Sequence, residues 1–198
     1  MLLPEFIQAI FPYRRMNRSL RILIGVNTVM VFTIGMFAPF YAVFVQKIGG
    51  DIVFAGFSWA VFSIVAGVLT LLFSRFEIKV KERELLLAFG YIVRGAVFLS
   101  YAFMTTIPQL LLTQVLWGIA VAIGVPAFDA IYSDHTTDGE SLTEWGRWEG
   151  IRAIAVGCAA LLGGVLINML GFQAVFLIMS AFSLLLAAHI WTLPRELL

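Results

Sequence analysis

The stretch QVLWGIAVAIGVPAFDAIYSD, residues 114–134, decides in which medium this chain folds. Its first fifteen residues carry no charge, and the aspartate that follows them, Asp129, has apolar neighbours. An unpaired carboxylate is rare in a soluble core and costly inside a lipid bilayer. The stretch therefore raises two questions: which medium surrounds it, and what the carboxylate does there.

The composition of the whole chain indicates a membrane protein. Of its 198 residues, 61% are hydrophobic and 13% are charged, and the mean hydropathy is +0.97. Soluble domains are about half apolar and about a quarter charged, so this chain has too little polar surface to cover a globule. A single cysteine, Cys158, excludes an internal disulfide and a cysteine metal cluster. Basic residues form short clusters without a basic face, which argues against a nucleic-acid partner.

Charge-free runs predict an all-α protein with six transmembrane helices. A spanning helix needs about 20 largely apolar residues. Pro108 suits the first turn of a helix, and Gly171 divides the charge-free run 153–194, which is too long for one span. The predicted helices cover residues 22–46, 52–74, 85–104, 109–133, 147–169 and 172–192 of a single domain, 1–198.

The distribution of Lys and Arg predicts that both termini are cytoplasmic. Loops rich in these residues stay on the cytoplasmic side of the plasma (inner) membrane, whereas the opposite side of the predicted topology carries Lys47 alone. The first twenty residues lack the order of a signal peptide and are predicted to lie along the membrane surface. The residues on the predicted cytoplasmic side are Arg14, Arg15, Arg18, Arg21, Arg75, Lys79, Lys81, Arg83, Arg147 and Arg152.

Three stretches carry a resemblance to a known family. They are NRSLRILIGVNTVMVFTIGMFAPFYAVFVQKIGGD (17–51), WGIAVAIGVPA (117–127) and GCAALLGG (157–164). From Asn17 onward the chain resembles one six-helix half of the major facilitator superfamily, whose members normally have twelve helices. The resemblance implies a 3+3 inverted repeat and the activity of a membrane transporter. Small bacterial proteins of this half-length pattern look similar to this chain.

The family motifs are altered in their chemistry. Ile78 stands where the loop after the second helix normally has an aspartate, and Gln114 stands where the fourth helix has an arginine, four residues before Gly118. Ala159 and Ala160 replace the Gly-Pro pair of the antiporter branch. These departures argue against a proton-driven drug antiporter.

A lone half can reproduce the whole arrangement as a symmetric homodimer, because both copies share one orientation. The resemblance then implies a substrate path along the first and fourth helices, partner contacts on the second and fifth, and lipid beside the third and sixth. The predicted function is secondary transport of a small, lipophilic molecule by alternating access. A non-transporting membrane subunit and a truncated half of a twelve-helix transporter are the alternatives. Small residues of the fourth and fifth helices serve either the dimer contact or packing within one copy.

Polar and aromatic residues of the apolar helices are the candidates for the substrate path. Asp129 and Gln114 are about 60° apart on one helix face, near opposite ends. Asn27 and Tyr41 lie on the face of the first helix that the resemblance turns toward the path, and hydrogen bonding between helices is an equally good reading. The substrate-path hypothesis contains Asn27, Tyr41, Gln114, Trp117 and Asp129.

Four charged residues form a predicted cytoplasmic cluster or gate: Asp129, Glu149, Arg152 and Arg94. Asp129 is expected to pair with Arg152, with Glu149 as its competitor. Arg94 lies near mid-membrane, where a charge needs a partner or water, so it either pairs with these carboxylates or binds an anion in the cavity. A static salt-bridge network is the alternative to a gate. The sequence has no nucleophile–base pair, metal-ligand cluster or phosphate loop, so neither an enzyme nor a cofactor is expected.

Overall fold

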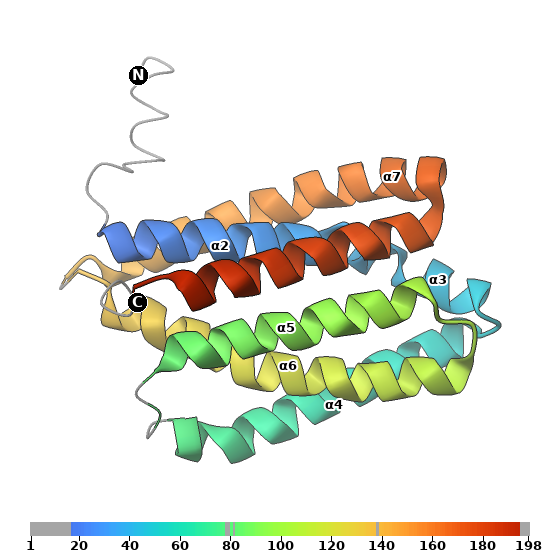
Figure 1. Ribbon diagram of the computed structural model, residues 1–198, viewed down its shortest axis with the longest axis horizontal. Coiled ribbons are helices and arrows are strands. Elements are labelled where there is room, and N and C mark those ends of the chain that lie inside the picture. Colours follow the sequence, from blue (N-terminus) through green and yellow to red (C-terminus); the bar gives the residue numbers. More distant parts are fainter. Residues whose placement is uncertain (1–16, 78–79, 81, 138, 195–198) are drawn as a thin grey trace.

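The computed structural model describes residues 17–77, 80, 82–137 and 139–194, and every regular element in these ranges is helical (Figure 1). The side chains of residues 74–77 are left out of the description. The predicted N-terminal surface segment and the motif position Ile78 lie outside the described residues. The elements are α2 (Arg18–Gly35), η1 (Ala38–Phe40), α3 (Tyr41–Lys47), α4 (Ile52–Glu77), α5 (Arg83–Ala102), α6 (Ile107–Asp134) and α7 (Ser141–Thr192).

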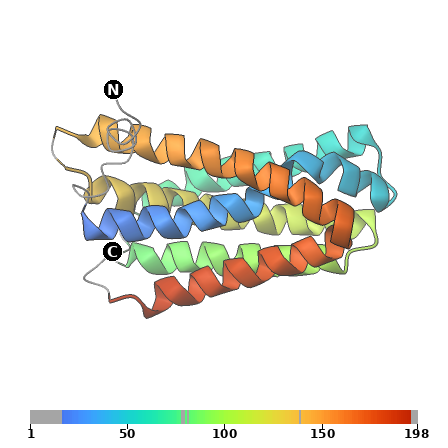
Figure 2. The same cartoon turned by 90° about the horizontal axis from the view of Figure 1, so that it is seen from above.

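The long helices pack side by side into a bundle, and successive membrane-length segments run in opposite directions along its long axis (Figure 1). Five stretches, with α2 to α3 taken as one, are long and apolar enough to cross a membrane. The last stretch, α7, has 52 residues and leaves helical geometry at Gly171, where φ is 80° and ψ is 170°. The chain reverses there, and Figure 2 shows the second arm running beside α5. Gly171 is therefore the dividing point that the sequence predicted, while the separate crossing of each arm stays a prediction.

The predicted continuous helix over residues 22–46 is wrong in its middle. The chain ends α2 at Gly35 and resumes through the short η1 before α3. Pro39 lies in the first turn of η1, and proline cannot donate the backbone bond that a continuous helix needs. The break therefore separates Tyr41 from the regular face that carries Asn27.

The start of α7 also differs from the prediction, by six residues: Ser141 instead of residue 147. Glu144 holds the segment between the predicted fourth and fifth helices in place. Its carboxylate accepts bonds from the backbone N–H and the hydroxyl of Thr137 at 2.9 and 3.2 Å. Tyr132 donates to the Glu144 carbonyl at 2.6 Å. The predicted position of Pro108 in the first turn of α6 is confirmed.

Glycines allow neighbouring helices to approach closely. A Cβ on Gly163 would lie 2.0 Å from the Met36 carbonyl oxygen, and one on Gly118 would lie 2.8 Å from the Val65 side chain. A Cβ on Gly90 would lie 3.0 Å from the Gly124 Cα. Lipid gives helices no hydrophobic reason to associate, so such contacts carry much of the packing. At these positions the small residues pack helices within one copy of the chain.

Two segments leave a flank of the bundle open. In the most apolar part of α4, 17% of residues are buried, against 56% in α5. The first arm of α7 is likewise sparsely buried, with Trp148, Ala155, Ala159 and Gly163 as its buried positions after the first turn. On α5, the exposed Phe89, Ile92 and Leu99 form one outward stripe at helical spacing, and the exposed Phe103 follows directly after the helix.

We expect Gly163→Ala to lower the free energy of unfolding by about 1–3 kcal/mol, because its methyl group would overlap the backbone at Met36. The matched control is Gly157→Ala on the same arm, where nothing lies within 4 Å of the added Cβ. The control should be neutral or stabilising by up to about 1 kcal/mol. Thermal unfolding in detergent, followed by circular dichroism, measures both. Equal midpoints for the two variants would contradict the close contact.

Candidate functional site

A cavity of about 520 Å³ lies between α2, α4, α5, α6 and the first arm of α7. Its walls are mainly apolar and aromatic, with a few polar groups, which is the usual character of small-molecule sites. The lining residues are Asn27, Met30, Val31, Ile34, Trp59, Phe62, Arg94, Trp117, Val121, Gly124, Val125, Phe128, Asp129, Trp145, Trp148, Glu149 and Arg152.

Arg94 is the buried charge of this cavity, with 4% of its surface exposed. Its guanidinium carbon lies 5.6 Å from the centre of the Tyr91 ring, a cation–π distance. A Cβ on Gly124 would lie 3.6 Å from one terminal nitrogen, so the guanidinium lies beside the backbone of α6 at this position. Within the described residues, Arg94 forms no ion pair, and its Nε has no hydrogen-bond partner. The predicted pairing with Asp129 or Glu149 is therefore not formed in this structure.

The other charged groups lie where α6 ends and α7 begins. Arg152 donates from Nε and a terminal nitrogen to Glu149 at 2.9 and 2.6 Å. Asp129 is exposed and forms no hydrogen bond or ion pair within the described part of the chain. The competitor Glu149 thus takes the place that was expected for Asp129, because it lies one helical turn from Arg152 on the same helix.

An aromatic wall closes the opposite end of the cavity. The Trp117 ring lies 4.8 Å from Phe62 and 6.2 Å from Trp59, between ring centres, and Trp59 packs edge-on against Tyr41. Behind the wall, the Tyr41 hydroxyl bonds to Ser58 at 2.7 Å and accepts a bond from Gln114. This cluster holds α3, α4 and α6 together.

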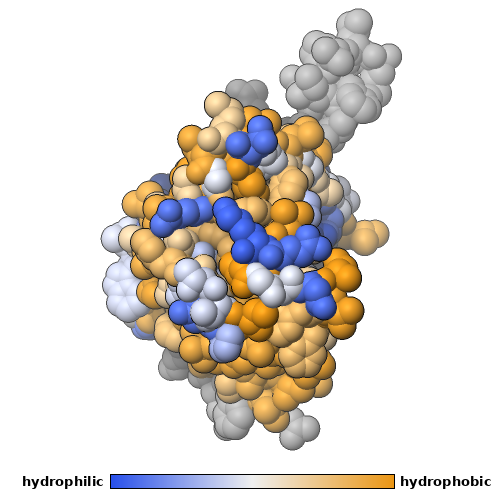
Figure 3. Space-filling view, turned by 90° about the vertical axis from the view of Figure 1, so that its right-hand side faces the viewer, coloured by the Kyte–Doolittle hydropathy of each residue, from blue (hydrophilic) through white to orange (hydrophobic). Residues whose placement is uncertain are grey.

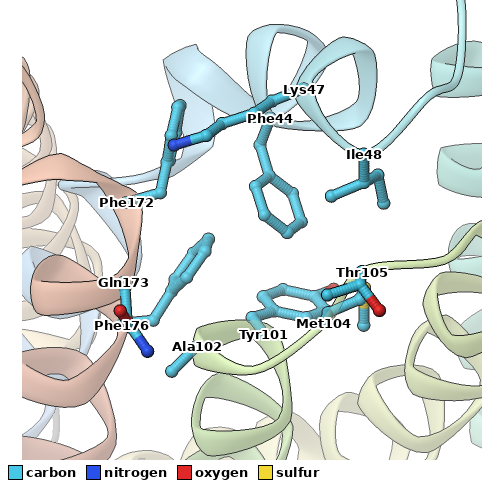
Figure 4. A pocket seen from close by; sticks show the side chains of 10 residues that line it. All are labelled: Phe44, Lys47, Ile48, Tyr101, Ala102, Met104, Thr105, Phe172, Gln173 and Phe176. Carbon is cyan, nitrogen blue, oxygen red and sulfur yellow. The ribbon is translucent and has the colours of Figure 1, made fainter.

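A second, smaller pocket of about 270 Å³ lies toward the α3 end of the bundle. Phe44, Tyr101 and Phe176 point toward a common centre there (Figure 4), and the Lys47 nitrogen lies 5.5 Å from the centre of the Phe172 ring. This end, seen in Figure 3, carries a band of hydrophilic side chains between apolar ones. The pocket shares no lining residue with the cavity.

The structure brings most of the predicted site residues to one place. Asn27, Trp117 and Asp129 line the cavity together with Arg94, Glu149 and Arg152. Tyr41 and Gln114 do not line it: their exposed fractions are 6% and 0%, and they bond to each other behind the aromatic wall. The roles assigned to all these residues stay predictions.

Comparison with known proteins agrees with this architecture. The sequence profile of the Major Facilitator Superfamily matches residues 23–197. The chain belongs to the major facilitator superfamily. It is 27% identical over 148 residues to the "Uncharacterized MFS-type transporter YitZ" of Bacillus subtilis (strain 168), an alignment that covers 74% of this chain and 89% of that protein. Family membership and the apolar helices together make it a multi-pass membrane protein.

Sequence reasoning missed two tryptophans that line this major facilitator cavity and one tyrosine, Tyr91, that contacts its lining residues. Tyr91 donates to the Asn27 side-chain oxygen at 2.7 Å and lies beside Arg94. Its spacing of three from Arg94 was the available signal, since residues three apart share a helix face. Trp145 was missed because it precedes the predicted start of the fifth helix at residue 147, and Trp148 was missed although it lies within that predicted helix.

We expect Tyr41 and Gln114 to be energetically coupled. Tyr41→Phe leaves the buried Gln114 amide without its acceptor, which costs about 1–3 kcal/mol, and Gln114→Leu removes the same bond from the other side. In a double-mutant cycle on unfolding free energies, the second substitution should therefore cost less once the first is present. Fully additive effects would contradict the bond.

Proposed function

We propose that this major facilitator protein is a secondary transporter whose cavity is one half of a substrate path. The observation that supports this proposal is the cavity itself, because a mainly apolar space with a buried arginine and an exposed aspartate can bind a small amphipathic molecule. The path lies between two copies of the chain and opens to alternate sides as the copies rock about the site.

The open flank of the bundle supports a homodimer. The sparsely buried α4 and the first arm of α7 both border the cavity, so a second copy placed against them would cover it.

The mouth of the cavity offers a gate. Arg152 is bonded to Glu149 in this structure, and in the proposed cycle it exchanges that carboxylate for Asp129 of its own copy or of the second. The exchange keeps the cation paired in both states, so the two states differ little in electrostatic energy.

The proposed orientation in the plasma membrane rests on the basic residues at one end of the bundle. The beginnings of α2, α5 and α7 and the ends of α4, α6 and α7 lie together at the left of Figure 1. Arg18 and Arg21 lie in the first turn of α2, Arg83 begins α5, and Arg147 and Arg152 lie near the beginning of α7. We place this end, with both termini, in the cytoplasm.

A non-transporting membrane subunit is the second candidate function. The observation in its favour is Gln114, which takes the place of the family's arginine and is fully buried in a structural bond to Tyr41. Such a subunit would hold the cavity against a different protein and would carry no flux alone.

Native mass spectrometry of the protein released from nanodiscs tests the homodimer. We expect a particle of two copies, because one copy leaves α4 and the first arm of α7 without a partner. A particle of one copy at all protein concentrations would overturn the homodimeric path.

Flux in proteoliposomes tests the transporter and its gate. With a panel of small fluorescent amphipathic molecules, we expect time-dependent uptake whose rate changes with pH. Asp129→Asn should flatten that dependence, since it removes the unpaired carboxylate from the cavity. Asp51→Asn is the matched control. It makes the same chemical change at the exposed start of α4, where the side chain accepts the Phe54 N–H and asparagine serves equally well. An unchanged pH profile in Asp129→Asn would eliminate the gate, and the absence of flux for every compound would favour the subunit.

A further inference from the structure

Arg94 gives the cavity a fixed positive charge in its interior. The side chain is 96% buried, it lines the cavity, and its Nε has no acceptor among the described residues. A buried charge is costly unless it is paired and hydrogen-bonded, and the Tyr91 ring supplies only a cation–π contact. A guanidinium offers a planar fork of donors that matches a carboxylate.

Asn27 adds a second donor beside it. The Tyr91 hydroxyl donates to the side-chain oxygen of Asn27, which uses one of the two lone pairs of that oxygen. The amide nitrogen of Asn27 can donate two hydrogen bonds, and no bond from it is formed within the described residues. Arg94 and Asn27 both contact Tyr91 and both line the cavity. The polar surface at this point is therefore made of donors and one positive charge.

Around these donors the walls are aromatic and apolar. Four of the five tryptophans line the cavity, namely Trp59, Trp117, Trp145 and Trp148. Such walls suit the apolar body of a ligand, and the volume of about 520 Å³ falls within the range of small-molecule sites.

Of the charged groups that line the cavity, Arg94 is the one that selects the charge of the ligand. Glu149 and Arg152 neutralise each other. Asp129 is exposed at the mouth, whereas Arg94 is buried in a low-dielectric interior where an electrostatic contact is stronger.

From this arrangement we infer that the cavity binds an amphipathic organic anion, with the carboxylate on Arg94 and Asn27 and the apolar body among the tryptophans. The inference rests on the proposed function in that it names the substrate class of the same cavity. Asp129, at the mouth of the cavity, then lines the route by which the anion enters and does not contact the bound anion.

Binding in a neutral detergent tests this without any flux. Three probes share one apolar body and differ in charge: phenylpropionate, phenylpropanol and phenylpropylammonium. Tryptophan fluorescence reports binding, because four tryptophans surround the site. We expect phenylpropionate to bind at least about tenfold more tightly than the other two, the ratio expected for a charged hydrogen bond of about 1.5 kcal/mol or more. Equal affinities, or tighter binding of the ammonium, would overturn the inference, the latter by assigning recognition to Asp129.

Variants locate the site. Arg94→Gln should weaken phenylpropionate by at least about tenfold and leave phenylpropanol unchanged, and Arg94→Lys should recover part of the loss, since it keeps the charge without the fork. The matched control is Arg83→Gln, which removes an arginine that pairs with Asp134 outside the cavity and should bind like the parent.

A second variant keeps the test valid if the arginine substitutions fail to fold. Asn27→Asp places a carboxylate beside Arg94 while keeping an acceptor for Tyr91. We expect this built-in anion to occupy the guanidinium and to weaken phenylpropionate at least about tenfold in a folded protein, and an unchanged affinity would overturn the site.

The outcomes separate the two proposals. Selective anion binding without flux of any anion would leave the site standing and remove the transporter. Flux of neutral or cationic compounds without selective anion binding would leave the transporter standing and remove the inference.

Discussion

Close approach of helix backbones at glycine is the constraint on which this bundle depends. In lipid, apolar side chains gain nothing by leaving the solvent, so helices associate through contact area and polar bonds. Gly163 against Met36, Gly118 against Val65 and Gly90 against Gly124 set three of the helix spacings. The Arg94 guanidinium lies beside Gly124 at the last of these contacts. A close helix contact therefore borders the candidate site.

The sequence predicted the features that depend on local chemistry. Charge-free runs located the apolar segments, and Pro108 and Gly171 marked boundaries because their backbone preferences act wherever the chain places them. The break before Tyr41 was missed although Pro39 signals it, because a long apolar run was read as one helix. The early start of α7 was missed since it depends on Glu144 capturing Thr137, a contact with no signature in hydropathy.

The sequence predicted most of the polar residues that meet at the candidate site, but it did not predict which of them bond to each other. Polar residues in apolar helices are few, and most of them had to meet in one interior space. Which of these side chains pair depends on which are close enough to bond and on which of the competing partners is nearer. Glu149 takes Arg152 because both share a helix turn, and Tyr41 takes Gln114 because the break in the first segment turns it behind the aromatic wall. The first choice follows from the spacing of three within α7, whereas the second joins two helices and cannot be read from spacing within one helix.

The reversal at Gly171 has a mechanical consequence. One residue with φ of 80° joins the two arms of α7, and no loop stands between them to absorb displacement. The first arm packs on α2 at Gly35 and Ala159, and the second is tied to α5 by the bond from Ser180 to the Gly95 carbonyl at 2.8 Å. A displacement of the arm that lines the cavity must therefore be taken up by the backbone angles of Gly171 or be passed on to the second arm, which packs on the opposite side of the bundle.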